Sequence, residues 1–135
     1  MVTVRVMQLD DHAQLERLWT PEGMESSQEY LQAVLNRNPD TCFVVEEDGR
    51  ILAAACGLYD GRRGFVQSVA VLPDERGRGY GRMVVQATVD ALLRLGTKRI
   101  RLFVKKTNGT VPQFYEKLGF EIQDATHYMG LRLPD

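Results

Sequence analysis

One short stretch of this chain limits its possible folds more than any other. Phe65 to Val71 is apolar enough to predict a strand that is buried on both faces and central in its sheet. A turn with three glycines follows from Pro73 to Arg82, and apolar residues at helical spacing from Tyr80 to Leu95 predict a helix that ends at Gly96. Such a turn directs backbone N–H groups at one point, where the helix dipole also favours an anion. The stretch therefore predicts a phosphate-binding turn in an α/β fold.

The elements before this stretch are predicted from periodicity and turn residues. Alternating valines at 2–6 indicate a strand, and Asp10 is placed to cap a first helix. Ser26 and Glu29 have the spacing of a capping box that opens a second helix. Asp48-Gly49 then favours a tight hairpin between two further strands, at 41–47 and 51–59.

The elements after the helix are shorter. A strand is expected at 99–104, then a short helix that Thr110 and Gln113 open as a capping box, then a last strand region at 120–133. The order β-α-α-β-β-β-α-β-α-β predicts an α/β fold with a mixed sheet and helices packed on it. We expect one domain over residues 1–135.

The charge of the chain is unevenly distributed along its length. Its 135 residues carry a net charge of −1, but residues 1–61 carry −7, residues 62–106 carry +8 and residues 107–135 carry −2. A basic segment inside a near-neutral protein indicates binding of an anion there. The charge alone leaves two kinds of partner open, a nucleic acid and a phosphorylated small molecule.

Several protein classes are disfavoured. The longest near-continuous apolar run, Ile51 to Leu58, is far shorter than the roughly 18 to 20 residues of a membrane span, and the N-terminus lacks the pattern of an export signal. Cys42 and Cys56 stand in apolar runs and indicate buried thiols. We expect a cytoplasmic protein that needs no disulfide, no metal ion and no membrane.

The glycine-rich turn matches one nucleotide-binding pattern. Arg82 stands where a dinucleotide fingerprint needs its third glycine, and no G-K-[ST] of a P-loop occurs. R-x-x-G-x-G remains, filled by Arg76, Gly79 and Gly81. Here the sequence resembles the GCN5-related N-acetyltransferase (GNAT) family. Downstream, Asn108 and the string FYEKLGF, which contains Tyr115, resemble the second signature of that family. The resemblance is strong from Phe65 to Phe120.

The resemblance implies a GNAT-like acyl-coenzyme A N-acyltransferase fold that binds acetyl-CoA in a gap beside the central strand. The pantetheine amides would pair with backbone groups of Val69, Ala70 and Val71. Asn108 would also contact the cofactor. The diphosphate would lie on the turn, whose implied contacts, mainly N–H groups, come from Arg76, Gly77, Arg78, Gly79, Tyr80, Gly81 and Arg82.

The implied reaction is attack of an uncharged amine on the thioester, with loss of the coenzyme A thiolate. A backbone N–H near Val71 would stabilise the oxyanion, and Tyr115 matches the general acid of the family. Phe65 to Val71 contains no carboxylate, so no carboxylate of this strand acts as the base. Gln67 or Ser68 would hold a water that accepts the proton, or the amine arrives already deprotonated.

The acceptor is left open. In the family it enters beside two loops that here are acidic, through Glu22, Glu25 and Asp124, which suggests a cationic small-molecule or peptide amine. Acidic loops are equally expected of an ordinary exposed surface. The sequence does not choose between a monomer and a homodimer.

Two other functions compete with acetyl transfer. A non-catalytic acyl-CoA sensor would keep the turn and would not need Tyr115. A nucleic-acid-binding module would use the basic residues outside the turn, although no aromatic platform accompanies them. Those basic residues are Arg62, Arg63, Lys98, Arg99, Arg101, Lys105 and Lys106.

Overall fold

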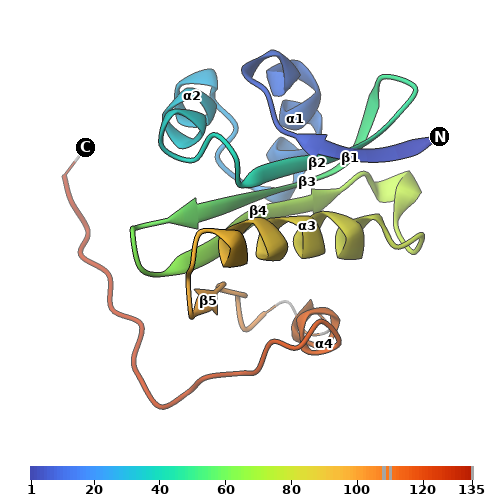
Figure 1. Ribbon diagram of the computed structural model, residues 1–135. Helices are drawn as coiled ribbons and strands as arrows, with labels where there is room; N and C mark the ends of the chain where they lie inside the picture. The colour runs from blue at the N-terminus through green and yellow to red at the C-terminus, as the bar shows by residue number, and fades with distance from the viewer. Residues whose placement is uncertain (108, 110, 135) are drawn as a thin grey trace. The chain divides into compact units, whose positions relative to one another are not determined.

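The computed structural model describes residues 1–107, 109 and 111–134, in two compact units, Met1–Phe103 and Val104–Asp135. Both units are shown in Figure 1. The strands of the N-terminal unit are β1 Val2–Val6, β2 Cys42–Glu47, β3 Arg50–Tyr59, β4 Gly64–Val71 and β5 Ile100–Arg101. Its helices are α1 His12–Trp19, α2 Gln28–Arg37 and α3 Tyr80–Arg94. The C-terminal unit contains α4 Val111–Glu116. The single domain over 1–135 stays a prediction.

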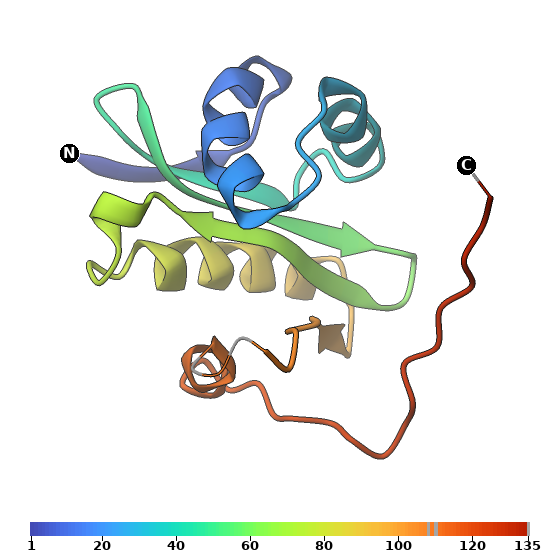
Figure 2. The ribbon, with the colours of Figure 1, turned by 180° about the vertical axis from the view of Figure 1, so that it is seen from behind.

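The five strands form one mixed sheet. Their order is β1-β2-β3-β4-β5, with antiparallel pairing from β1 to β4 and parallel pairing between β4 and β5. Helices α1 and α2 cover one face of this sheet and α3 covers the other, as Figures 1 and 2 show. The predicted mixed α/β architecture is confirmed.

Turn chemistry explains the hairpin and the start of α2. Asp48 and Gly49 both have positive φ, 51° and 81°, which is the type I′ geometry that joins β2 to β3. The cap of α2 is one residue later than predicted: the Ser27 hydroxyl accepts a hydrogen bond from the Tyr30 N–H. Ser26 instead pairs its hydroxyl with that of Thr20, so the expected Ser26–Glu29 capping box is wrong. The first helix also starts later than predicted, with Asp11 as its N-cap.

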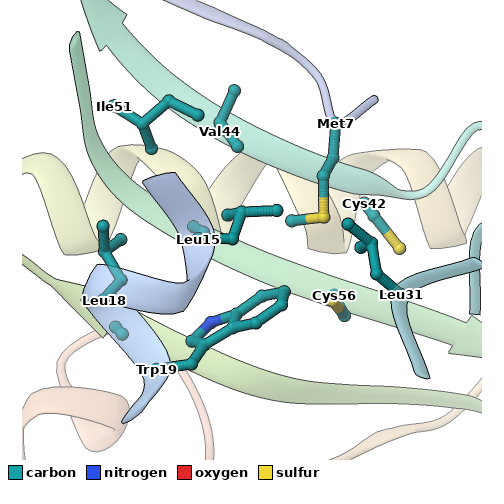
Figure 3. Close-up of a cluster of buried hydrophobic side chains, with 11 residues drawn as sticks. Met7, Leu15, Leu18, Trp19, Leu31, Cys42, Val44, Ile51 and Cys56 are labelled. Atoms are coloured by element: carbon teal, nitrogen blue, oxygen red, sulfur yellow. The ribbon is translucent and has the colours of Figure 1, made fainter. Parts of the chain in front are cut away.

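The main hydrophobic core lies between the sheet and the helices α1 and α2. Figure 3 shows Trp19 and Leu15 of α1 and Met7 packed over Cys56 and Cys42 of the sheet. Both cysteines are free and fully buried, as the apolar runs around them predicted. The remaining members of this core are Leu18, Leu31, Val44, Ile51, Ala54 and Ala70.

The C-terminal end of the chain departs from the predicted strands. β5 is limited to Ile100–Arg101, and the expected strand at 120–133 is absent from the residues that the structure describes. A strand persists only with a backbone partner and a face to bury. Ile122, Met129 and Leu131 are 69%, 86% and 86% exposed, so the apolar residues of this segment bury no such face. The capping box of Thr110 lies outside the described residues.

No helix among the described residues is both long enough and apolar enough to cross a bilayer.

Candidate active site

One edge of β4 is largely unpaired. β4 pairs with β5 only at Gly64↔Ile100 and Phe65↔Arg101. From Val66 to Val71, the edge that faces away from β3 has no strand partner within the described part of the chain. β4 is not the central strand that the sequence predicted: it is the fourth of five, next to the two-residue edge strand β5. Several of its side chains are only half-buried, so the predicted burial on both faces is also wrong. An unpaired edge inside a sheet offers backbone N–H and C=O groups to a ligand.

A β-bulge interrupts β4 beside this open edge. Cys56 pairs with Gln67, and Ala54 pairs with Ala70. Between these two pairs β4 therefore contains one residue more than β3. Ser68 lies there with φ of 57°, in the left-handed region that non-glycine residues rarely adopt. The extra residue changes which peptide groups of β4 face its partner strand.

The register after the bulge determines which groups face the open edge. The Leu72 N–H donates to the Leu52 carbonyl at 2.9 Å. Peptide groups of an antiparallel strand alternate between its two neighbours, so Ala70 also faces β3 and its N–H and C=O belong to the ladder. Val69 and Val71 therefore present their peptide groups to the unpaired edge. Of the three β4 residues predicted to contact the cofactor, these two have backbone groups free for it.

Two aromatic residues contact the bulge, and the sequence assigned both only to apolar helix faces. The Trp19 indole Nε1–H donates to the Ser68 carbonyl at 2.8 Å, and the Tyr30 hydroxyl lies 2.9 Å from the Ser68 hydroxyl. The Gln67 amide donates to the Tyr30 hydroxyl at 2.7 Å. Burial raises the pKa of Tyr30 above its usual value, so this hydroxyl is neutral at physiological pH. The polar atom on each ring was the available signal, because a buried indole or phenol needs a partner.

The glycine-rich turn leaves the N-terminus of α3 open. Gly77 and Gly79 have φ of 82° and 88°, and no side chain caps the helix that starts at Tyr80. Met83 is the first residue to donate back to Gly79, at 3.0 Å. The N–H groups of the three residues before it therefore lack intrahelical acceptors, as at any helix start. A Cβ on either glycine would meet nothing within 4 Å, so glycine is required there for backbone conformation and not for space.

Two of the three arginines of the turn already have carboxylate partners. Arg76 pairs with Glu22 of the loop after α1, and Arg78 pairs with Glu75 at 3.1 Å. No carboxylate pairs with Arg82 among the described residues. The Arg76–Glu22 pair is of the exposed kind, which contributes only about 0 to 1 kcal/mol, so a phosphate replaces this carboxylate at small cost.

Eight of the eleven basic residues of the segment 62–106 fall into two separate groups. Arg76 and Arg78 lie in the turn before α3, and Arg82 lies in the first turn of α3 itself. At the other end of α3 and β4, a cavity of about 620 Å³ is lined by five further basic residues together with Tyr59, Gly61 and Gly96. Figure 1 places the turn and the β3–β4 hairpin at opposite ends of the sheet. The five basic residues of this cavity are Arg62, Arg63, Lys98, Arg99 and Arg101.

Tyr115 belongs to the C-terminal unit, in α4. Its ring makes edge contacts with Phe114 and Phe120, at centroid distances of 5.0 and 5.8 Å. Burial raises the pKa of Tyr115 above its usual value and keeps the hydroxyl protonated, which is the form a general acid needs. Asn108, the predicted cofactor contact of this unit, lies outside the described residues.

The acidic loop after α1 is less available to a cationic acceptor than its composition suggested. The Glu22 carboxylate forms an ion pair with Arg76. Glu25 is exposed, and hydrogen bonds from Ser27 lower the pKa of its carboxyl group. Of the two acidic residues in this loop, Glu25 therefore has the carboxylate free of an ion pair.

Comparison with known proteins settles the family. Residues 6–120 match the profile of the acetyltransferase (GNAT) family. The chain belongs to this family. A relative described as an acetyltransferase, from Sodalis glossinidius, is 34% identical over 128 residues, which cover 95% of this chain and 87% of the relative. The chain is therefore an N-acetyltransferase of the GNAT family.

Solved structures of this family share the fold. A protein from Agrobacterium tumefaciens, described as an acetyltransferase, superposes with a TM-score of 0.80 at 24% identity, over 96% of this chain and 99% of that chain. N-acetylglutamate synthase from Neisseria gonorrhoeae, in complex with coenzyme A and N-acetyl-glutamate, gives a TM-score of 0.73 at 22% identity. That match covers 87% of this chain and 28% of the synthase, so the shared part is the GNAT fold alone.

Proposed function

We propose that this GNAT protein transfers the acetyl group of acetyl-CoA to a primary amine by direct attack on the thioester. The observation that carries the proposal is the open edge of β4, which runs into a turn whose glycines leave the N-terminus of α3 uncapped. A neighbour of the same fold was solved with coenzyme A, which supports a coenzyme A ligand for this fold.

Backbone groups provide most of the proposed cofactor contacts. The peptide groups of Val69 and Val71 pair with the pantetheine amides, and the turn from Arg76 to Arg82 binds the diphosphate. Backbone N–H groups suit both tasks because they are fixed by the fold and need no side-chain ordering. Asn108 is retained as a further contact on the resemblance of its sequence context alone.

The proposed chemistry conserves protons and electrons. The amine nitrogen attacks the thioester carbonyl carbon, and a backbone N–H near Val71 stabilises the oxyanion of the tetrahedral intermediate. The C–S bond then breaks, and the thiolate takes a proton from Tyr115. A water beside Gln67 or Ser68, both already bonded to the Tyr30 hydroxyl, accepts the proton of an acceptor that arrives as an ammonium ion, or the amine arrives already deprotonated. After the attack the nitrogen carries one further proton, which it releases to water, and the Tyr115 phenolate regains its proton from water. A thiol of pKa about 8.5 leaves readily near neutral pH, so positioning supplies most of the rate.

Thiol release from acetyl-CoA in the presence of an amine panel tests this function directly. We expect release that depends on the amine, together with acyl-CoA bound to the purified protein in native mass spectrometry. Binding of coenzyme A without turnover on any amine would instead identify a sensor. Binding of nucleic acid that weakens steeply with salt, and is lost when the basic residues of the 620 Å³ cavity are replaced, would support the nucleic-acid alternative.

The panel also tests whether the acceptor is cationic. We propose a polyamine, a lysine side chain or a peptide amino terminus, because Glu25 and Asp124 remain as acidic groups on the two loops implied for acceptor entry. A neutral or anionic amine that is acetylated more efficiently than these would contradict the cationic acceptor and leave acetyl transfer itself standing.

Glu22→Gln should tighten the binding of coenzyme A by about two- to fivefold, because it frees Arg76 from an ion pair of the exposed kind. Isothermal titration with coenzyme A measures the change. Glu25→Gln is the matched control, since this carboxylate lies in the same loop and binds Ser27 instead of the turn. The difference between the two variants should shrink at high salt. Equal affinities of Glu22→Gln and the unchanged protein at low salt would show that the pair does not compete with the diphosphate.

A further inference from the structure

We infer that Trp19 and Tyr30 are positioning residues for acyl transfer: from α1 and α2 they hold Ser68 in the bulge and thereby set which peptide groups of β4 meet acetyl-CoA. The inference rests on the proposed function, because it concerns the same open edge. Neither ring needs to touch the substrate for this role.

The register shows what the bulge changes. The Gly57 N–H donates to the carbonyl of Thr41, the residue just before β2, so its neighbour Cys56 faces β4 and pairs with Gln67. In an unbulged strand, alternation from Gln67 onward would turn Ser68 and Ala70 to the open edge. The single inserted residue reverses this order, and Val69 and Val71 face the edge instead.

The bulge is held by hydrogen bonds to both the backbone and the side chain of Ser68. The Trp19 N–H binds its carbonyl at 2.8 Å, and the Tyr30 hydroxyl lies 2.9 Å from its hydroxyl. A positive φ is unfavourable for serine, so the conformation persists only where surrounding contacts enforce it. Gln67, the residue just before the bulge, donates to the same Tyr30 hydroxyl at 2.7 Å and secures the adjoining part of β4.

The two rings are themselves fixed. Trp19 is fully buried in the core of Figure 3, so its N–H has no water as an alternative partner. The Trp19 and Tyr30 rings meet edge to face, at a centroid distance of 6.2 Å and an interplanar angle of 81°. The rings come from two different helices, so the packing of both α1 and α2 on the sheet fixes the position of Ser68 in β4.

A double-mutant cycle tests whether Tyr30 acts through Ser68. Tyr30→Phe keeps the ring and removes the hydroxyl, and we expect kcat/KM to fall about tenfold, with a raised KM for acetyl-CoA and an unchanged KM for the amine. In a Ser68→Ala background, the same Tyr30→Phe change should have a clearly smaller effect, because the contact with Ser68 is already gone and only the hydrogen bond from Gln67 is lost. Tyr59→Phe is the matched control: its hydroxyl donates to the Leu95 carbonyl at 3.4 Å, far along the sheet from the bulge.

A second pair of variants separates the effect of the backbone conformation of Ser68 from the effect of losing its hydroxyl. Ser68→Gly and Ser68→Ala both remove the hydroxyl, but glycine adopts positive φ freely. We expect Ser68→Gly to retain several times the kcat/KM of Ser68→Ala. If Ser68→Gly is as impaired as Ser68→Ala, or if Tyr30→Phe costs the same in both backgrounds, the inference is wrong.

Amide hydrogen exchange keeps this test independent of turnover. In the unchanged protein without ligand, the Val69 and Val71 amides should exchange faster than the Ala70 amide, and Tyr30→Phe and Trp19→Phe should reduce this difference. An exchange pattern that neither variant alters would overturn the positioning role, even if acetyl transfer is observed. Absence of acetyl transfer together with the expected exchange pattern would contradict the proposed function and leave the holding of the bulge intact.

Discussion

Gly79→Val should weaken coenzyme A binding at least tenfold, measured by isothermal titration. Gly79 has φ of 88°, directly before the first residue of α3. A β-branched residue disfavours this left-handed conformation by about 1 to 2 kcal/mol, so the turn relaxes to another geometry. The N–H groups at the start of α3 then no longer converge on one phosphate.

The control for this variant has to carry the same backbone strain elsewhere. Gly49→Val provides it, because Gly49 has φ of 81° in the β2–β3 hairpin and, like Gly79, would place its Cβ in open space. Both variants should lower the midpoint of thermal unfolding by similar amounts, while only Gly79→Val loses affinity for coenzyme A. Equal loss of affinity in the two would mean that strain, and not the turn, causes the effect.

Tyr115→Phe should lower kcat severalfold or more and leave the affinity for coenzyme A nearly unchanged. The substitution preserves the edge contacts of the ring with Phe114 and Phe120, so only the proton donor is removed. Phe120→Leu is the control for packing, since it disturbs the same aromatic cluster and retains the hydroxyl. An unchanged rate of thiol release in Tyr115→Phe would remove this residue from the mechanism.

The pH dependence of kcat provides a second check on Tyr115. The donor is the neutral phenol, and burial raises its pKa above the ordinary value of about 10. The donor is therefore lost only at a pH above that value, and the rate should not fall between about pH 7 and 9 through ionisation of Tyr115. A descending limb in this range that Tyr115→Phe abolishes would contradict the raised pKa.

Short sequence patterns correctly predicted the turns whose conformation depends only on residues close by in the chain. Asp48-Gly49 gives the expected hairpin, because two residues with positive φ suffice to set that turn. The turn before α3 follows for the same reason, since Gly77 and Gly79 supply positive φ and the apolar stripe that starts α3 is close by. The strand expected at 120–133 was wrong because a strand needs a face to bury, and the apolar residues Ile122, Met129 and Leu131 of this segment are exposed.

The site could be predicted only in part. The glycines of the turn belong to one continuous segment, so their grouping is a property of the sequence. Trp19 and Tyr30 carried the ordinary signal of core residues, because their contacts with Ser68 bridge 49 and 38 positions of the chain. Ala70 was grouped with its two neighbours, since a bulge that reverses the facing of peptide groups leaves no trace in an apolar run.

The sequence by itself determined the family, the glycine conformations of the turn and the uneven charge along the chain. Only the tertiary structure decided how that charge is distributed in space: three arginines lie in the turn before α3 and in its first helical turn, and five basic residues line a cavity at the opposite end of the sheet. It also decided which peptide groups of β4 stand free. The free peptide groups depend on the register of β4 against β3, and the two basic groups depend on how α3 packs along β4. Both are set by contacts between residues far apart in the chain.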